Sequence, residues 1–346
     1  MTMKAAVTDG KGGLWIEDLP IPEPSEYQAL CKVHACASCT GTDLKHMKNA
    51  LPWEQTYPGL LGHEGIGSVV KMGAKVRNIK EGEMFLRPAL AYPGEKYEGY
   101  LSMWSGFAEY GLVTDVKALA EDDPEAKPSA FTRFQLPVPA EANIPPAEAT
   151  MMITLKETAS YAATSGVGFL KKVMVLGAGS VGLSMIHFAK VLGGTPVIAV
   201  ARRDEQLAYA KDVIGADFVI NSAKEDVIAR AAELTGGEGV DVLLDTTGSH
   251  EFLASCMPVL GPEGKAGAYA TYERGSDMAG IIPPERNAGG RTGEDIAHQY
   301  MLDAVRLGLV DLSNYYSHKV TLDELPQAFE MLKRKEAFKI VAMMED

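Results

Sequence analysis

The chain has 346 residues, of which 46% are hydrophobic and 23% charged, so it is long enough for two globular domains, each with its own core. Its formal net charge of −13 argues against nucleic acid or an anionic membrane as a partner, and no apolar run approaches the roughly 18 residues of a transmembrane helix. Four cysteines without a disulfide pattern, and an N-terminus without the features of a signal peptide, lead us to expect a reducing, cytoplasmic compartment.

The first third of the chain predicts a compact β-rich domain. Residues 4–8, 30–35, 65–71 and 84–86 are apolar and rich in strand-forming residue types. Residues 118–138 are different, because they are acidic and contain prolines. Such a composition is typical of an exposed surface loop.

From Val173 the pattern changes to strands that alternate with helices. This alternation predicts parallel pairing and a doubly wound α/β sheet. Glycines at the ends of the predicted helices are expected to act as C-caps. The later strand candidates are residues 197–200, 218–220, 240–244 and 265–269, and the glycines are Gly193, Gly215, Gly236 and Gly261.

The last part of the chain predicts a return to the first domain. Residues 275–293 are rich in glycine and proline and predict a long loop. A helix is expected over 294–307, another begins near Leu322, and the chain ends in a strand over 339–343. We therefore expect a catalytic domain of residues 1–148 with 290–346, and an inserted nucleotide-binding domain of residues 149–289.

A glycine-rich turn follows the apolar run that begins at Val173. The segment from Gly177 to Gly182 has the pattern G-x-G-x-x-G and lies between a predicted strand and a predicted helix, the context of a dinucleotide-binding turn. Gly177 allows the tight turn, Gly179 lets the backbone approach a pyrophosphate, and Gly182 lets the helix pack against the strand. Ser180 and Val181 lie at the start of that helix, whose N–H groups would face the phosphates.

The end of the next predicted strand indicates which dinucleotide is bound. An NAD site usually has an acidic residue there, which holds the ribose 2′-hydroxyl, but this chain has Ala201 followed by Arg202 and Arg203. A guanidinium can hold a 2′-phosphate through paired hydrogen bonds, so we expect NADP(H). Asp204 keeps NAD as the alternative. Thr246 completes the residues that we expect at the cofactor.

A second group of chemically active residues lies in the β-rich part of the chain. It consists of Cys39 to Asp43 together with Gly62-His63-Glu64. Cysteine and neutral imidazole are ordinary zinc ligands, and a catalytic zinc site typically has three protein ligands and one open position. A threonine beside such a metal could relay a proton. Without further context, the same residues also fit a small buried cysteine and a structural histidine.

The order of these motifs resembles that of the medium-chain dehydrogenase/reductase superfamily, nearest to its zinc alcohol and polyol dehydrogenases. The resemblance implies a GroES-like β-rich catalytic domain and a Rossmann cofactor domain. It also implies a small alcohol or carbonyl substrate and a homo-oligomer, a dimer or a tetramer. The motifs that carry it are C-x-x-T-D from Cys39, the segment Gly62 to Val69, Gly106 to Tyr110, and Val173 to Gly182.

The resemblance also implies roles for individual residues. Cys39 and His63 would bind a catalytic zinc ion. Glu64 would lie beside the metal, as an alternate ligand or as a carboxylate next to the ligands. Thr42 would take the position of the hydroxyl that relays a proton, and Asp43 would orient a ligand histidine.

The chain departs from the family pattern at the zinc ligands. Its C-x-x-T-D segment is one residue longer than the family's C-x-T-D, and we place the ligand at Cys39 rather than Thr40 because threonine is a poor zinc ligand. The third ligand position falls near Ile153-Thr154-Leu155, which do not suit zinc. Glu157, about one helical turn later, is the nearest substitute.

Two further departures concern proton relay and structural zinc. The family's relay histidine would come two residues after Asp43, where this chain has Lys45, with His46 next to it. A four-cysteine structural zinc site is excluded, because no cysteine lies between Cys39 and Cys256.

Three hypotheses follow from the sequence. The first is a zinc- and NADP(H)-dependent alcohol dehydrogenase or carbonyl reductase, in which zinc polarises the substrate oxygen and the nicotinamide carries the hydride. The second is a zinc-free, NADPH-dependent protein similar to quinone or enal reductases. The third is an NADPH-binding protein without enzymatic activity.

Overall fold

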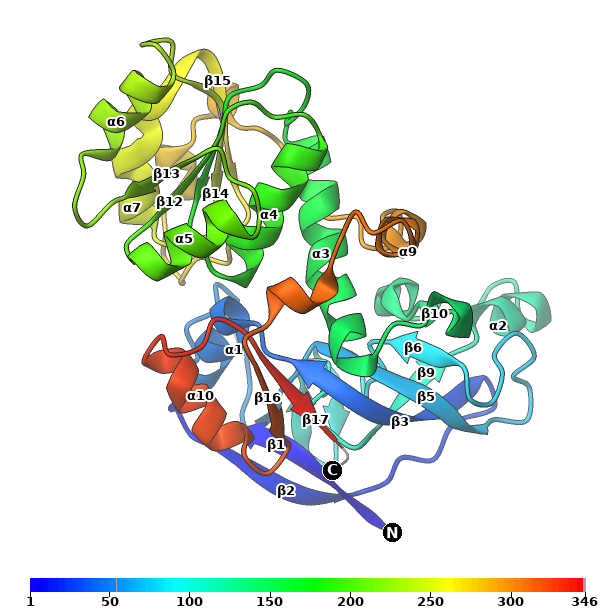
Figure 1. The fold of residues 1–346 in the computed structure, drawn as a ribbon. Helices are drawn as coiled ribbons and strands as arrows, with labels where there is room; N and C mark the ends of the chain where they lie inside the picture. The colour runs from blue at the N-terminus through cyan, green and yellow to red at the C-terminus, as the bar shows by residue number, and fades with distance from the viewer. Residues whose placement is uncertain (54, 345–346) are drawn as a thin grey trace. The chain divides into compact units, whose positions relative to one another are not determined.

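The computed structural model describes residues 1–53 and 55–344, which fold into two compact units (Figure 1). The first unit comprises Met1–Ile153 and His298–Asp346, and the second comprises Thr154–Ala297. The sequence predicts junctions after residues 148 and 289, whereas the contacts place them after Ile153 and Ala297. Among the described residues, no helix has the length and apolar character needed to cross a membrane.

The second unit is built on a five-stranded sheet with the strand order β13-β12-β11-β14-β15, in which every neighbouring pair is parallel. Its two central apolar runs, β11 and β12, are buried along their whole length, as in parallel sheets that helices cover on both faces. The predicted Rossmann-type α/β fold is confirmed. The strands are β11 (Val173–Leu176), β12 (Val197–Ala201), β13 (Phe218–Asn221), β14 (Val240–Asp245) and β15 (Leu260–Ala268).

Helices connect these strands, and their ends follow the sequence signals. The side chains of Asp226 and Ser249 accept hydrogen bonds from the first turns of α6 and α7. Gly193, Gly215 and Gly236 have positive φ after helices, as predicted. Gly261 does not cap a helix but lies within β15, where a Cβ would come within 2.6 Å of the Glu238 carbonyl oxygen. The helices are α4 (Ser180–Val191), α5 (Asp204–Asp212), α6 (Val227–Leu234) and α7 (His250–Cys256).

Two further segments of the chain differ from the predicted pattern. The predicted loop over 275–293 contains a four-residue helix, α8 (Met278–Ile281), and a 3-10 turn, η4 (Pro284–Arg286). The helix expected over 294–307 is shorter, because α9 spans His298–Arg306. A long helix, α3 (Pro146–Thr164), contains the junction at Ile153.

The first unit is β-rich, as predicted, and contains two sheets. Their orders are β2-β1-β4-β8-β7 and β10-β6-β5-β3-β17-β16, and β9 pairs with β3. The four predicted strands lie within β1, β3, β5 and β6. The strands of this unit are β1 (Thr2–Thr8), β2 (Leu14–Pro20), β3 (Gln28–Ala37), β4 (Gly59–Leu60), β5 (Glu64–Met72), β6 (Met84–Leu86), β7 (Lys96–Tyr97), β8 (Tyr100–Ser102), β9 (Tyr110–Thr114), β10 (Pro137–Val138), β16 (His318–Thr321) and β17 (Ile340–Met343).

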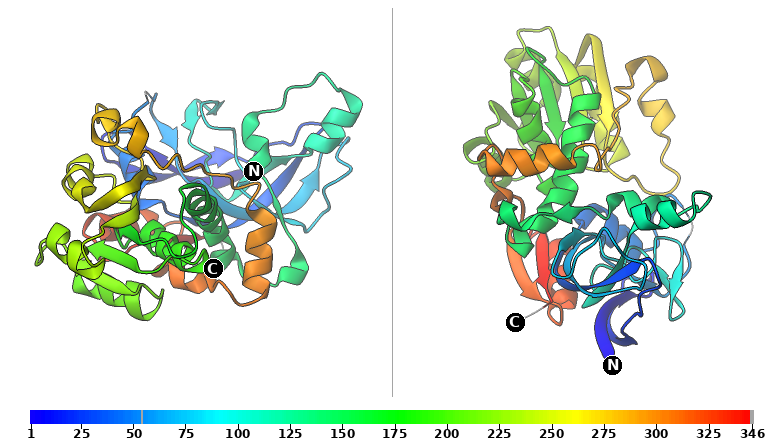
Figure 2. Two further views of the ribbon diagram at one scale, coloured as in Figure 1. Left: turned by 90° about the horizontal axis from the view of Figure 1, so that it is seen from above. Right: turned by 90° about the vertical axis from the view of Figure 1, so that its right-hand side faces the viewer.

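The C-terminal segment is part of the first unit. Strand β17 pairs antiparallel with β3 and parallel with β16, and Figure 1 shows the red β17 beside β3. Figure 2 shows the same ribbon from two further sides. Helix α10 (Leu325–Lys333) packs Leu325, Phe329 and Leu332 into a core cluster that also contains Phe107. The short helix α1 (Thr40–Met47) follows β3 directly.

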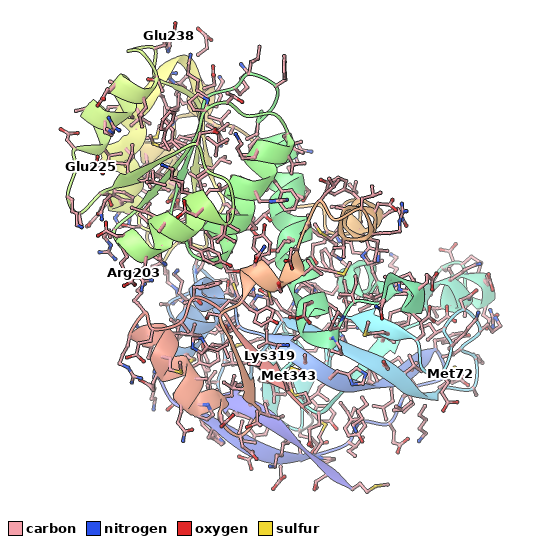
Figure 3. All side chains as sticks on the ribbon, in the orientation of Figure 1. Met72, Arg203, Glu225, Glu238, Lys319 and Met343 are labelled. Atoms are coloured by element: carbon pink, nitrogen blue, oxygen red, sulfur yellow. The ribbon has the colours of Figure 1, made fainter. Side chains whose placement is uncertain are left out.

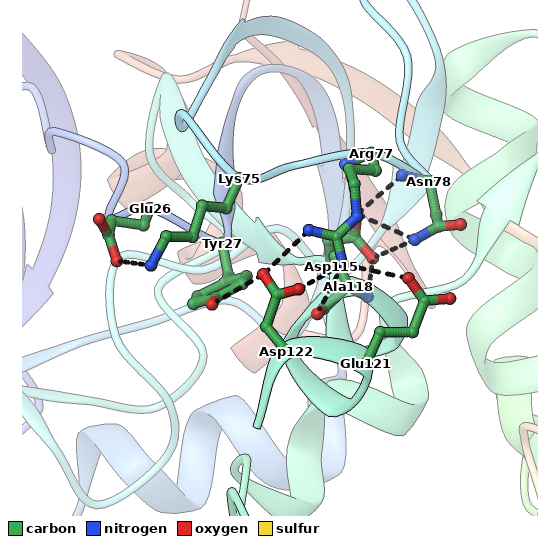
Figure 4. A network of polar contacts seen from close by, with 9 residues as sticks. All are labelled: Glu26, Tyr27, Lys75, Arg77, Asn78, Asp115, Ala118, Glu121 and Asp122. Carbon is green, nitrogen blue, oxygen red and sulfur yellow. Dashed lines mark hydrogen bonds and ion pairs between the residues drawn. The ribbon is translucent and has the colours of Figure 1, made fainter. Parts of the chain in front are cut away.

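The acidic segment 118–138 is not a plain surface loop. It contains most of α2 (Val116–Asp122) and all of a 3-10 helix, η1 (Ala130–Phe134). Arg77 holds α2 through both side-chain oxygens of Asp122, the Glu121 carboxylate and the Ala118 carbonyl (Figure 4). The composition predicted exposure, but it could not show that a distant arginine neutralises the acids and orders the segment.

Candidate active site

Cys39 lies in the short connection between β3 and α1, at the N-cap of the helix. The Asp43 side chain folds back, and its Oδ2 accepts a hydrogen bond of 2.8 Å from the Cys39 amide. This contact satisfies an N–H group at the helix start, as in a capping box. The Cys39 Sγ lies 3.4 Å from the Thr42 Oγ1, so the thiol and the hydroxyl occupy the same side of the first turn.

His63 and Glu64 lie at the start of β5, in register with the end of β3. Glu64 pairs with Ala37, which brings the segment beside the Cys39 connection. Gly62 has φ +96°, and a Cβ there would come within 2.3 Å of the Phe107 amide nitrogen. A glycine is therefore required before His63, because any side chain would displace the chain that presents the imidazole.

Three potential metal ligands converge where these segments meet. The ligand atoms of Cys39, His63 and Glu64 all lie within 4.8 Å of one another, and we call these three residues the ligand cluster. Asp43 Oδ1 lies 3.3 Å from His63 Nδ1, so one fully buried carboxylate contacts both the cysteine amide and the histidine ring. Sulfur, imidazole nitrogen and carboxylate oxygen form a donor set that fits zinc, and a carboxylate on the second ring nitrogen is the usual support for such a histidine.

The two histidines near this cluster have opposite pKa shifts. Burial lowers the pKa of His63. The charge of Asp43, a side-chain contact with Asp43 and the Cys39 thiol raise it by more, so the pKa of His63 lies well above its ordinary value. Burial lowers the pKa of His46 to about 4, although Asp43 and Gln55 act in the opposite direction. The His46 ring is held by Gln55, with 2.7 Å between Nδ1 and Oε1, and it is neutral at pH 7.

Two buried basic residues that were not predicted from the sequence contact the cluster. The Lys339 Nζ forms an ion pair with Glu64 Oε2, and both side chains are 2% exposed. The Arg87 Nη1 donates a hydrogen bond of 2.7 Å to the His63 carbonyl oxygen, and its guanidinium lies over the Trp104 ring. Neither belongs to a motif. The only sequence signal was a lysine at the edge of the apolar run that forms β17.

Glu157, the substitute ligand predicted from the sequence, has a different contact. Its Oε2 accepts a hydrogen bond of 2.8 Å from the Tyr269 hydroxyl, within the second unit. In the part of the chain that the structure describes, the group of potential metal ligands does not include it. Ile153, Thr154 and Leu155 are buried in α3.

The glycine turn in the second unit has the geometry of a cofactor cradle. Gly177 has φ +100°, and a Cβ on Gly182 would lie 2.1 Å from the Gly177 carbonyl oxygen. Thr246 closes the turn, since its Oγ1 donates to the Leu176 carbonyl at 2.7 Å. A Cβ on Gly179 would meet no atom of the described chain within 4 Å. The N-terminus of α4 at Ser180 and Val181 therefore opens onto free space that suits a pyrophosphate.

Two arginines follow β12 directly. Ala201 is the last residue of β12, Arg202 is exposed, and Arg203, labelled in Figure 3, precedes α5 and contacts Gln206 through its Nε at 3.1 Å. The Asp204 carboxylate has two partners. Its Oδ1 accepts a hydrogen bond of 2.6 Å from Asn221, and its Oδ2 pairs with Lys224. The lysine contact lowers the pKa of Asp204.

Comparison with known proteins finds a matching family model within each unit. A model described as a zinc-binding dehydrogenase matches residues 180–290, and one described as an alcohol dehydrogenase GroES-like domain matches residues 25–121. The L-threonine 3-dehydrogenase of Pyrococcus abyssi is 28% identical over 351 residues, covering 96% of each chain. An alcohol dehydrogenase of Cupriavidus necator is 26% identical, covering 95% of this chain and 94% of that one. Among solved structures, benzyl alcohol dehydrogenase from Acinetobacter calcoaceticus matches the fold with a TM-score of 0.82, at 23% identity and full coverage of both chains.

Proposed function

Because this chain belongs to the medium-chain dehydrogenase/reductase superfamily and is an NAD(P)-dependent oxidoreductase, we propose that it is a zinc-dependent alcohol dehydrogenase or carbonyl reductase that uses NADP(H). The observation that carries the proposal is the ligand cluster, in which three donor atoms of suitable chemistry lie within 4.8 Å. The substrate would be a small alcohol, ketone or aldehyde. We also expect a homo-oligomer, a dimer or a tetramer.

Each residue of the cluster has a proposed task. Zinc held by Cys39, His63 and Glu64 would supply Lewis-acid polarisation of the substrate oxygen. Asp43 Oδ1 lies 3.3 Å from His63 Nδ1, which leaves Nε2 as the ligand atom. We assign the third ligand to Glu64 rather than Glu157, because Glu157 Oε2 accepts the Tyr269 hydroxyl hydrogen bond.

Thr42 is the proposed proton relay. Its Oγ1 lies 3.4 Å from Cys39 Sγ, at the edge of the ligand cluster. A hydroxyl there can accept the substrate's hydroxyl proton at Oγ1 while it donates its own proton onward. His46 and Lys45 are the onward acceptors expected from the sequence. Since the pKa of His46 is lowered to about 4, that ring would carry the proton only transiently at neutral pH.

NADP(H) preference is supported by the charges after β12. Arg202 and Arg203 supply guanidinium groups where an NAD enzyme usually has an acid. Asp204, which kept NAD as an alternative, is bound by Lys224 and Asn221. A carboxylate in that state is less available to a ribose hydroxyl.

A second candidate is a zinc-free, NADPH-dependent quinone or enal reductase. It is favoured by the family's third ligand position, which falls at the apolar, buried Ile153 and its neighbours. In this case the ligand cluster would have a structural role only, and Glu64 would form its ion pair with Lys339.

Metal quantitation distinguishes the two candidates. Protein purified without chelator would be analysed for metal per chain, and its turnover measured with NADPH and NADH on alcohols, ketones, quinones and enals. One zinc per chain with turnover of an alcohol or ketone agrees with the proposal. Folded, metal-free protein that reduces quinones or enals would replace it with the second candidate.

A further inference from the structure

Lys339 and Glu64 form a buried ion pair directly beside the ligand cluster. Both residues are buried. The two carboxylate oxygens of Glu64 have different neighbours, because Oε2 pairs with the Lys339 Nζ while Oε1 lies 3.9 Å from His63 Nε2. One carboxylate is thus shared between an ammonium group and the place where a metal ion would bind.

The backbone around Lys339 is fixed to the same connection that carries Cys39. The Phe338 carbonyl accepts a hydrogen bond of 3.1 Å from the Thr40 hydroxyl, and the Ile340 amide donates to Ser38 Oγ at 3.0 Å. The Lys339 carbonyl itself accepts from the Ser317 amide at 2.8 Å. These contacts lie on both sides of the lysine and hold its backbone beside the Cys39 connection, and its ammonium group reaches the cluster through the ion pair with Glu64.

We propose that Lys339 is a positioning residue that competes with the metal for Glu64 and thereby weakens metal binding. The proposal rests on the metal site of the proposed function. A buried carboxylate needs a cationic partner, and in the metal-free protein that partner is Lys339. When a divalent cation binds, it must share Glu64 with the ammonium group and tolerate a positive charge nearby.

The sign of the effect separates this role from a merely structural one. Removing an ordinary partner of a metal ligand weakens metal binding by about 10–100-fold, because the ligand loses its orientation. Removing a competitor does the opposite. Lys339→Met keeps the aliphatic stem and deletes the charge, and Lys339→Gln keeps a neutral hydrogen-bond donor for Glu64. We expect both variants to bind zinc roughly 10-fold more tightly than the wild type. This gain equals the smallest loss expected when an ordinary partner of a metal ligand is removed.

The experiment measures zinc affinity by competition with a chromogenic chelator, using the full chain freed of metal. The visible spectrum of the Co²⁺ form reports whether the thiolate of Cys39 is still a ligand. Glu64→Gln and the double variant Glu64→Gln/Lys339→Met complete a cycle. The gain in zinc affinity from Lys339→Met should be several-fold larger in the chain with Glu64 than in the Glu64→Gln variant. Only the carboxylate of Glu64 becomes available to the metal when the lysine charge is removed.

Each outcome of this experiment is decisive. Tighter zinc binding in Lys339→Met or Lys339→Gln, dependent on Glu64, supports the proposal. Unchanged or weaker binding in variants with the wild-type circular dichroism spectrum overturns it, and so does an equal gain in both Glu64 backgrounds. If neither the wild type nor the lysine variants bind zinc, the zinc-dependent function fails together with this proposal. If the wild type binds zinc and the variants bind it no better, only the role of Lys339 fails.

Discussion

The glycine turn and the ligand cluster are built in different ways. The turn from Gly177 to Gly182 is one contiguous segment, and its geometry is set by the backbone. The ligand cluster is built from side chains of separate segments, the Cys39 connection and the start of β5, with Lys339 from the far end of the chain in contact with it.

This difference determines how each site responds to sequence change. The glycine turn depends on the absence of side chains, so an added methyl group damages it through steric overlap. The ligand cluster depends on the identity of a few polar atoms, so it can lose its chemistry without losing its fold. Chemical substitutions should therefore separate activity from stability at the cluster, but not at the closely packed glycines of the turn, Gly177 and Gly182.

The largest effect is expected for Cys39→Ser. The loss of the thiolate should remove stoichiometric zinc and lower alcohol oxidation by about 10³-fold, because Lewis-acid polarisation contributes several kcal/mol. Thermal unfolding should change little, since the Asp43 contact uses the Cys39 amide. Metal analysis and steady-state turnover are the measurements. Cys256→Ser, in the second unit, is the control and should keep its metal; full activity in Cys39→Ser would exclude Cys39 as a ligand.

Thr42→Val should lower turnover by about 10²-fold, at the lower end of general acid–base contributions. The hydroxyl is lost while the shape is kept, so NADPH affinity and the melting temperature should stay near the wild-type values. Thr42→Ser should retain most activity. Thr40→Val is a matched control, because it removes a hydroxyl that bonds the Phe338 carbonyl. A Thr42→Val enzyme that melts lower but turns over normally would contradict the relay.

Gly182→Ala should lower the free energy of unfolding by about 1–3 kcal/mol, a typical cost of overpacking. Its Cβ would lie 2.1 Å from the Gly177 carbonyl oxygen, so the turn must open. Gly179→Ala should leave stability nearly unchanged and weaken NADPH binding, because the methyl group would occupy the space meant for the pyrophosphate. Denaturant titration and cofactor titration test the pair. Equal destabilisation by both substitutions would mean that the turn is not a backbone cradle.

Arg202→Ala should weaken NADPH binding by about 10-fold, the equivalent of one charge-assisted hydrogen bond, and leave NADH binding unchanged. The measurement is titration of both cofactors against wild type and variant. Arg230→Ala removes a similar charge from α6 and should not alter the preference. If the wild type binds NADH as tightly as NADPH, the assignment of NADP(H) fails.

The sequence predicted the parts of the molecule whose signals are local. The turn from Gly177 to Gly182, the apolar run of β11 and the missing acid at Ala201 are each visible within a few residues. The parallel sheet followed from the alternation of elements, and β6 has the predicted bounds. Gly261 was placed wrongly because a glycine in a strand and a glycine after a helix look alike without knowledge of pairing.

The partners of the ligand cluster could not be predicted because they depend on long-range packing. Lys339 follows Glu64 by 275 positions in the sequence, and β17 brings the two together only by pairing with β3. Arg87 contacts the carbonyl of His63 through a buried guanidinium, which no spacing rule describes. The assignment of Cys39 as a ligand rested on chemistry, and its distance to His63 needed the structure.

The segment between α2 and η1 is attached to the first unit on both of its sides. Arg77 and Asp115 hold its beginning, and Gln135 holds its end by donating to the Arg87 and Leu112 carbonyls. The tip from Asp123 to Glu125 is exposed, and exposed loop tips are preferred sites of proteolytic cleavage. A single cut at Glu125 would therefore leave two polypeptides that stay associated under native conditions and separate only when the protein is denatured.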